Sequence, residues 1–250
     1  MAAARSGSDG RPMQDKKLEL LVLGAGQGAA HVYDGGCSTG MLLTDAGSPL
    51  LLIDAGFGVT RACLEHCGSV PGRIAVTHNH SDHAAELPVI LRVEQARGRR
   101  LAVYAESEVA RRLKLHRLAE HAEVMGPDDL ADWHSADAGV RLPLARGLEI
   151  EFVTARHSEH CCGLLLHAGE RTLFGYTGDS VVDEALYARI ATANTRLYDA
   201  RPGPSRWHAS FEELAGRLGE RDYVVSHGLP PGAAADGLAL LHAGDRLRLA

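Results

Sequence analysis

Short apolar, β-branched or aromatic runs recur along the chain, separated by stretches in which apolar residues follow helical spacing. Short runs bounded by turn residues are typical of strands, and apolar positions three and four apart are typical of helices. The predicted strands lie near residues 18–23, 39–44, 49–54, 73–77, 101–105, 148–154, 163–168, 172–177, 195–199 and 222–226. The predicted helices lie near residues 82–96, 106–121, 183–192 and 209–219. The pattern indicates an α/β protein.

The order of these elements favours two sheets packed face to face with helices outside. A hairpin is predicted where Ala168-Gly169-Glu170 joins the runs Leu164-Leu165-Leu166 and Thr172-Leu173-Phe174. No repeat, low-complexity segment or linker divides the chain, so residues 16–250 are expected to form one domain. The pattern is weakest over residues 126–146, where we expect a loop that could cover the site.

Composition narrows the class of protein. The apolar fraction of 45% allows a sizeable core, and the net charge of −6 argues against a general nucleic-acid coat protein. No apolar run approaches the length of a membrane span, and Met1 to Asp15 are expected to be a disordered leader. We therefore expect a cytoplasmic protein without a membrane partner. Five cysteines, an odd number, indicate reduced thiols.

The most informative motif is His78-Asn79-His80-Ser81-Asp82-His83, which follows a predicted strand. Residues two apart on extended chain point the same way, so His78 and His80 can share one metal ion. Asp82 and His83 stand where a helix is predicted to begin, and can face a second ion. A polar loop of unrelated histidines is the alternative, and four matches at fixed offsets disfavour it.

Further candidate ligands come directly after predicted strands. Residues in these positions converge at one edge of a sheet. They are Asp54, His157, Asp179 and His227. Alone, each would be an ordinary polar residue at a strand end; together with the motif, they favour a metal site.

This order of an early aspartate, a His-x-His-x-Asp-His loop, a later histidine, an aspartate and a last histidine resembles the metallo-β-lactamase superfamily. The resemblance implies an αββα four-layer sandwich that binds two Zn²⁺ ions per chain. It also implies the following ligands: His78, His80 and His157 for one ion, Asp82, His83 and His227 for the other, and Asp179 as a bridge between them. Asp54 would brace the loop from behind. Nitrogen and oxygen ligands suit zinc and also admit manganese or iron.

Within the superfamily the chain is most similar to ribonuclease Z and its small phosphodiesterase relatives. The glycine-rich turn Leu23–Gly28 and the segment Leu52–Arg61 carry this likeness. So do His157-Ser158 with Gly163, and Gly178-Asp179-Ser180. Tyr198-Asp199-Ala200 and His208-Ala209-Ser210 resemble the pair of motifs that supplies the catalytic acid, although Asp199 stands where the relatives usually have glutamate.

The resemblance implies hydrolysis, in which two ions lower the pKa of a shared water and stabilise a developing oxyanion. His208, oriented by Asp199, is the expected proton donor to a leaving alkoxide, and Asp82 is counted with this pair as catalytic. Arg201 and Arg206 lie between Asp199 and His208 and can hold a phosphate, unless they are ordinary loop arginines. We expect a phosphodiesterase that acts on small cyclic or nucleotide diesters, and a homodimer by resemblance.

Alternatives stay open. A thioester or lactone hydrolase could use the same metals, and a non-catalytic metal-binding module is the least favoured. A tRNA-processing endonuclease is not favoured, because we see no basic, glycine-rich arm to grip the nucleic acid. The basic residues beyond the motif are interpreted as solvated helix faces. They are Arg97, Arg99, Arg100, Arg111, Arg112, Lys114 and Arg117.

Cysteine and histidine also cluster away from the motif. Cys63 and Cys67 flank His66 on a predicted helix, and Cys161-Cys162 follow His160. A second metal site is conceivable there, but the spacing matches no common zinc finger, so we interpret these cysteines as packing thiols. His160 competes with His157 for the ligand role. We prefer His157 because it directly follows the strand.

Overall fold

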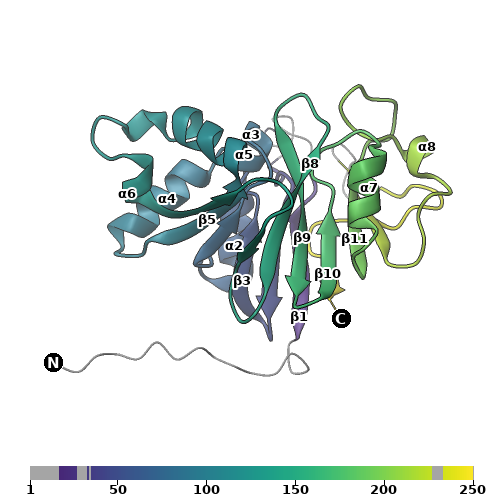
Figure 1. Ribbon diagram of the computed structural model, residues 1–250, viewed down its shortest axis with the longest axis horizontal. Coiled ribbons are helices and arrows are strands. Elements are labelled where there is room, and N and C mark those ends of the chain that lie inside the picture. Colours follow the sequence, from purple (N-terminus) through teal and green to yellow (C-terminus); the bar gives the residue numbers. More distant parts are fainter. Residues whose placement is uncertain (1–16, 27–32, 34, 227–232, 250) are drawn as a thin grey trace.

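The computed structural model describes residues 17–26, 33, 35–226 and 233–249. Two sheets pack against each other in the middle of the molecule, with helices on both outer sides (Figure 1). This is the expected αββα sandwich, and that prediction is confirmed. The expected leader, Met1 to Asp15, lies outside the described residues.

The first sheet has the strand order β14-β1-β2-β3-β4-β5-β6. Its strands are β1 (Leu18–Gly24), β2 (Gly40–Asp45), β3 (Ser48–Ile53), β4 (Arg73–Ala75), β5 (Leu101–Glu106), β6 (Ala131–Ala136) and β14 (Arg246–Arg248). Strands β1 to β3 pair antiparallel, and β3 to β6 pair parallel.

The second sheet has the order β13-β12-β11-β10-β9-β8-β7. Its strands are β7 (Arg141–Pro143), β8 (Glu149–Ala155), β9 (Cys161–Ala168), β10 (Arg171–Tyr176), β11 (Thr195–Ala200), β12 (Asp222–Ser226) and β13 (Leu240–Leu241). Strands β7 to β10 pair antiparallel, which confirms the predicted β9–β10 hairpin, and β10 to β13 pair parallel. Each sheet therefore has an antiparallel and a parallel half.

The helices cover the outer faces of the two sheets (Figure 1). Beside the first sheet lie α2 (Val59–Cys67), α3 (Ser81–Ala84), α4 (Leu87–Ala96), α5 (Ser107–Arg112), the π-helix η2 (Leu113–Arg117), the 3₁₀-helix η3 (Ala119–His121) and α6 (Pro127–Leu130). Beside the second lie α7 (Glu184–Ile190) and α8 (Phe211–Leu214).

The core lies between the two sheets, where both inner faces are apolar. All eight residues of β9 are buried, as an apolar run in the middle of a sheet requires. Leu20, Leu42, Leu52, Phe152 and Phe174 are among the fully buried side chains. This core fixes the strands, so the loops at their carboxyl ends are held in place.

Several predictions of local structure were wrong. Residues 126–146 form α6 and the two edge strands β6 and β7, and not only a loop. β6 escapes a search for apolar runs because an edge strand needs few buried residues, and here most of its side chains are not buried. The predicted helix 82–96 is two helices, 106–121 is three short ones, and 209–219 is only a single turn at α8. Within the described residues, no helix is long and apolar enough to cross a membrane.

Candidate metal centre

The loop after β4 carries the His-x-His-x-Asp-His motif, and Asp54 holds it from behind. Asp54 follows β3, the neighbour of β4, and is fully buried. One of its carboxylate oxygens accepts a hydrogen bond from the Thr77 backbone N–H (2.8 Å), and the other accepts one from Thr77 Oγ1 (2.9 Å). The backbone of Asp54 has φ 62°, a left-handed conformation that costs energy for a residue with a side chain. The fold therefore maintains a strained aspartate at the expected bracing position.

The chain also packs tightly beside Asp54. A Cβ atom at Gly56 would lie 1.7 Å from the backbone oxygen of Asp82. Only glycine fits there, so the close approach of the ligand loop explains the glycine two residues after Asp54.

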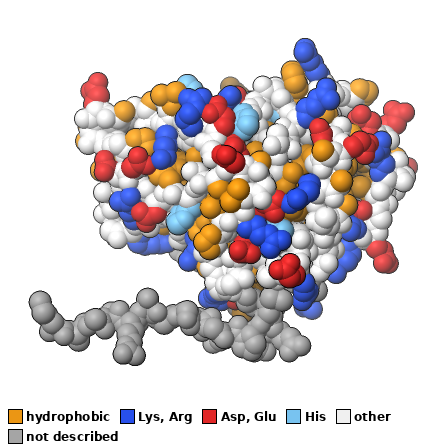
Figure 2. All heavy atoms as spheres, in the orientation of Figure 1, with side chains coloured by type: hydrophobic (Ala, Val, Ile, Leu, Met, Phe, Trp, Pro, Cys, Tyr) orange, Lys and Arg blue, Asp and Glu red, His pale blue; other side chains and the backbone are white. Residues whose placement is uncertain are grey.

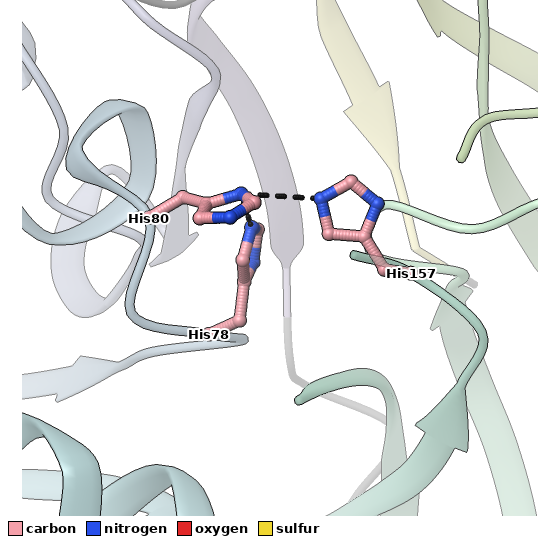
Figure 3. A group of neighbouring side chains, drawn as sticks. All are labelled: His78, His80 and His157. Carbon is pink, nitrogen blue, oxygen red and sulfur yellow. Dashed lines mark hydrogen bonds between the residues drawn. The ribbon is translucent and has the colours of Figure 1, made fainter. Parts of the chain in front are cut away.

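Three histidine nitrogens converge in front of this loop. Nδ1 of His80 lies 3.1 Å from Nε2 of His78 and 3.1 Å from Nε2 of His157 (Figure 3). His78 and His80 come from the loop after β4, and His157 comes from the loop after β8, in the other sheet. The site is thus assembled at the line where the two sheets meet.

The outer nitrogens of two of these rings show where their protons are. His157 Nδ1 lies 3.0 Å from the carbonyl oxygen of Trp207, which can only accept, so Nδ1 carries the proton. Thr77 Oγ1 donates to Asp54 and therefore accepts from His78 Nδ1 at 3.1 Å. Both Nε2 atoms then present lone pairs to His80 Nδ1. One proton on His80 cannot satisfy both, whereas a metal cation can, so these residues fit the ion that the resemblance implies.

Burial favours the same protonation states. It lowers the pKa of His78 well below the ordinary histidine value, and it also lowers the pKa of His80 and of His157. Three neutral imidazoles at neutral pH are what a transition-metal ion requires of its histidine ligands.

His83 lies in a different environment. Burial opposes a charge on its ring, but Asp179 and Asp54 outweigh burial and raise the pKa of His83 well above the ordinary value. Its Nδ1 is 2.8 Å from Asp54 Oδ2, and its Nε2 is 3.3 Å from Asp179 Oδ2 and 3.9 Å from Asp82 Oδ2. A carboxylate behind one ring nitrogen is the usual support of a metal-binding histidine. Without metal, a proton supplies the positive charge that these carboxylates stabilise.

Asp179 lies between the two groups. It follows β10 and is buried, with Oδ2 3.3 Å from His83 Nε2, 3.8 Å from His157 Nε2 and 3.9 Å from His78 Nε2. This position is consistent with the expected bridge. The fifth histidine of the expected ligand set, His227, lies outside the described residues.

The expected acid pair stands beside this centre. Asp199, at the end of β11, is fully buried, and its Oδ2 accepts a hydrogen bond from His208 Nδ1 at 2.6 Å. The His208 ring packs edge-to-face against His157, with centroids 4.9 Å apart. One ligand atom each of His157, Asp179 and His208 lie within 4.8 Å of one another. The shorter aspartate therefore still reaches the imidazole.

Comparison with known proteins places the chain in a family. A family model described as "Anti-Pycsar protein Apyc1" matches residues 18–221. The chain belongs to this family. No curated protein matches the sequence.

Solved structures share its fold at low sequence identity. The metallo-β-lactamase fold protein YhfI from Bacillus subtilis has a TM-score of 0.69 and 17% identity, covering 92% of this chain and 99% of that one. A diphosphatase from the PhnP family has a TM-score of 0.69 and 19% identity, and the match covers 92% of this chain and 96% of the diphosphatase. Human tRNase Z, short form, has a TM-score of 0.66 and 13% identity, and the match covers 93% of this chain and 99% of the tRNase. The metallo-β-lactamase fold is thus confirmed, whereas the finer likeness to ribonuclease Z remains a prediction.

The two arginines expected to hold a phosphate make no contact with this centre in the described part of the chain. The exposed Arg206 guanidinium lies over the Trp207 ring, 4.7 Å from its centroid. Arg201 Nε is buried and meets no hydrogen-bond acceptor among the described residues.

Most of the basic residues beyond the motif pair with nearby acids, as expected of helix faces. Arg97 and Arg99 pair with Glu94, Arg111 and Arg112 with Glu108, Arg100 with Asp132, and Lys114 with Asp128. Arg117 differs. From the π-helix η2 it donates to Asn79 in the ligand loop, from Nη2 to the backbone oxygen at 2.6 Å and from Nε to Oδ1 at 3.2 Å. Sequence reasoning missed this role, because it depends on the π-turn.

Proposed function

We propose that the protein is a dinuclear metal-dependent phosphodiesterase that acts on small cyclic or nucleotide diesters. The observation that carries this proposal is the Asp199–His208 pair, which packs against His157 at the edge of the convergent histidines. A metal centre alone supports many hydrolases. A supported imidazole beside it adds the proton donor that an alkoxide leaving group needs.

The ligand assignment follows the two groups of side chains. His78, His80 and His157 would hold one ion, and Asp82, His83 and His227 the other, with Asp179 shared. When bound, two such ions supply Lewis-acid stabilisation of negative charge and a nucleophilic water near neutral pH. The nitrogen and oxygen donors suit zinc, and manganese or iron would also fit.

His208 is the proposed acid. Its Nδ1 is held by the buried Asp199 carboxylate at 2.6 Å, so a second proton on the ring goes to Nε2. The carboxylate fixes the orientation of the ring, and Nε2 can then deliver its proton to the leaving oxygen. Arg206 remains a candidate for binding the phosphate, because it is exposed and stacks on Trp207, whose carbonyl orients His157. Arg201 has no comparable support.

Several observations favour a small diester. The family description, anti-Pycsar protein, hints at degradation of cyclic nucleotides. The fold neighbours include a diphosphatase, a tRNase Z and yeast PDE1, all at identities that show the fold alone. The net charge is −6, and acidic and basic side chains are interspersed over the face seen in Figure 2. That surface offers little attraction for a long nucleic acid.

We also propose that the protein is a homodimer. Exposed apolar side chains on α2 and α4 support this: Leu64, Val89 and Val93 are all more than a third exposed, and Leu64 and Val89 line one groove. Light scattering at micromolar concentration should give twice the chain mass of 26.7 kDa, and the single mass would contradict the proposal.

Replacement of His208 by alanine tests the proposed chemistry. Acid catalysis typically contributes about 10² to 10⁴ in rate where the leaving group is poor. We expect a loss of that size on cyclic nucleotides and alkyl diesters, a much smaller loss on a nitrophenyl diester, and unchanged metal content. Asp199→Asn should show the same pattern more weakly. An equal loss on every diester, or loss of metal, would rule out the acid assignment. Faster turnover of thioesters or lactones by the wild type would reject the phosphodiesterase.

A further inference from the structure

A second group of metal-binding side chains lies outside the centre described above. It consists of Glu106 at the end of β5, His160 in the loop after β8, and Cys162 in β9. One ligand atom from each lies within 4.8 Å of the others. None of the three belongs to the ligand set proposed for the dinuclear site.

The contacts leave donor atoms available at this position. His160 Nε2 lies 2.8 Å from Glu106 Oε2, which also accepts the backbone N–H groups of Glu108 and Val109 at the start of α5. In the described part of the chain, Glu106 Oε1 accepts no hydrogen bond. Oε2 thus both supports the helix and faces His160, and the carboxylate keeps a second oxygen that makes no hydrogen bond to a described residue.

Cys162 differs from most other thiols of the chain. Cys37, Cys63 and Cys161 each donate to a backbone carbonyl oxygen. Cys162 is fully buried, yet its Sγ makes no hydrogen bond to any described residue. A packing thiol needs no such partner, but a packing role does not explain why this sulfur lies beside a buried carboxylate and an imidazole.

The group is also open to solvent on one side. His160 is about one-third exposed and lines a groove of about 670 Å³ together with Arg112, His157 and Ser158. An ion can therefore enter past His160 and meet Glu106 and Cys162 on the buried side.

We propose that Glu106, His160 and Cys162 bind a third metal ion, with zinc as the best match and a water from the groove as fourth ligand. One sulfur, one nitrogen and one oxygen donor suit zinc. On binding, the Cys162 thiol releases its proton to solvent, and the His160 proton moves to Nδ1. Two anionic ligands then neutralise the two positive charges, so the half-buried site carries no net charge.

The geometry requires only a local adjustment. Tetrahedral zinc with bonds of about 2.0–2.3 Å holds its ligand atoms roughly 3.3–3.5 Å apart, so the three atoms must close by at most about 1.5 Å. His160 is on a loop and can move, whereas Glu106 and Cys162 are fixed on strands. The ion would tie the loop that carries His157 to the end of β5. It would thereby help to position a ligand of the neighbouring centre.

Cobalt substitution separates this site from the dinuclear one, whose proposed ligands include no cysteine. The wild type loaded with Co²⁺ should show a sulfur-to-cobalt charge-transfer absorption in the near ultraviolet and one ion per chain beyond those of the dinuclear site. Cys162→Ser should lose both the absorption and that ion. Cys63→Ser, which removes another fully buried thiol, should keep both. Asp179→Asn should lose ions and keep the absorption.

His160→Gln provides a second variant, because this side chain is not in the core and its loss should not disturb folding. We expect at least a tenfold weaker affinity of Co²⁺ for the absorbing site, since even an outer-shell partner is worth 10 to 100-fold. Absence of the absorption in fully loaded wild type would overturn the proposal, as would its persistence in Cys162→Ser or unchanged affinity in His160→Gln. If the absorption appears while the protein cleaves no phosphodiester, the third site stands and the proposed function fails.

Discussion

Two groups of side chains in the candidate metal centre both include residues of the loop after β4 but differ in charge. His78, His80 and His157 present nitrogen alone, and burial keeps their pKa values low. His83 lies between Asp54 and Asp179, and these carboxylates raise its pKa despite burial. In the first group, an ion would bind the nitrogen lone pairs that otherwise point toward one another. In the second it replaces a proton. The two positions should therefore bind metal with different affinity and different dependence on pH.

The largest effect should come from the residue between the two groups. Asp179→Asn removes a buried negative charge that lies within 3.9 Å of His78 Nε2 and 3.3 Å of His83 Nε2. Both ions should be weakened at once, and turnover should fall by more than the roughly 10 to 100-fold cost of an outer-shell partner. Elemental analysis and diester hydrolysis measure this. Asp45→Asn, which removes a buried carboxylate paired with Arg146, is the matched control. Loss of only one ion would show that Asp179 is no bridge.

A smaller and one-sided effect is expected from Asp54→Asn. Asp54 contacts His83 directly but reaches His78 only through Thr77. The ion on the His83 side should bind about 10 to 100-fold more weakly, and the ion on the other side should change less. Titration against a competing chelator resolves the two steps. Equal weakening of both would mean that the two groups do not act separately.

The contrast between the groups was not visible in the sequence, although most of their members were. His78 to His83 could be found because the motif is contiguous, and Asp54, His157 and Asp179 because each follows an apolar strand. Their charge states depend on burial and on which nitrogen faces Trp207, Thr77 or Asp54, and only the packed fold sets these. The Glu106–His160–Cys162 group was missed for a related reason. Glu106 is 54 residues from His160, and only the folded chain brings the end of β5 beside the loop that precedes β9.

Acid sensitivity of the metal-free protein should also separate the two groups. The pKa values of His78, His80 and His157 are lower in the folded state than the unfolded value of about 6.5, so the unfolded chain binds more protons as pH falls below that value. These residues therefore destabilise the fold in acid. The raised pKa of His83 has the opposite sign: its stabilisation is complete below about pH 6.5 and is lost as pH rises through the folded pKa.

Urea unfolding of chelator-treated protein between pH 8 and pH 5 tests these signs. The free energy of unfolding should fall on acidification, because the lowered pKa values of His78, His80 and His157 act against the single raised pKa of His83. His83→Gln should make the fall steeper, and His80→Gln should make it shallower. The same slope in both variants would remove the electrostatic distinction between the groups.

The smallest effect we expect comes from Arg117, which supports the first group from outside. Its guanidinium binds Asn79, between His78 and His80, by two hydrogen bonds, and a lysine keeps the charge but cannot reproduce the two-pronged contact. Arg117→Lys should therefore weaken the ion on the His78 side by up to about tenfold and leave the His83 side almost unchanged, the reverse of Asp54→Asn. Arg111→Lys, on the preceding helix and paired among the described residues only with Glu108, is the control for loss of a surface guanidinium. Chelator competition again gives both affinities. If Arg117→Lys and Arg111→Lys behave alike, the contact with Asn79 contributes only to the surface of the loop and not to the position of its ligands.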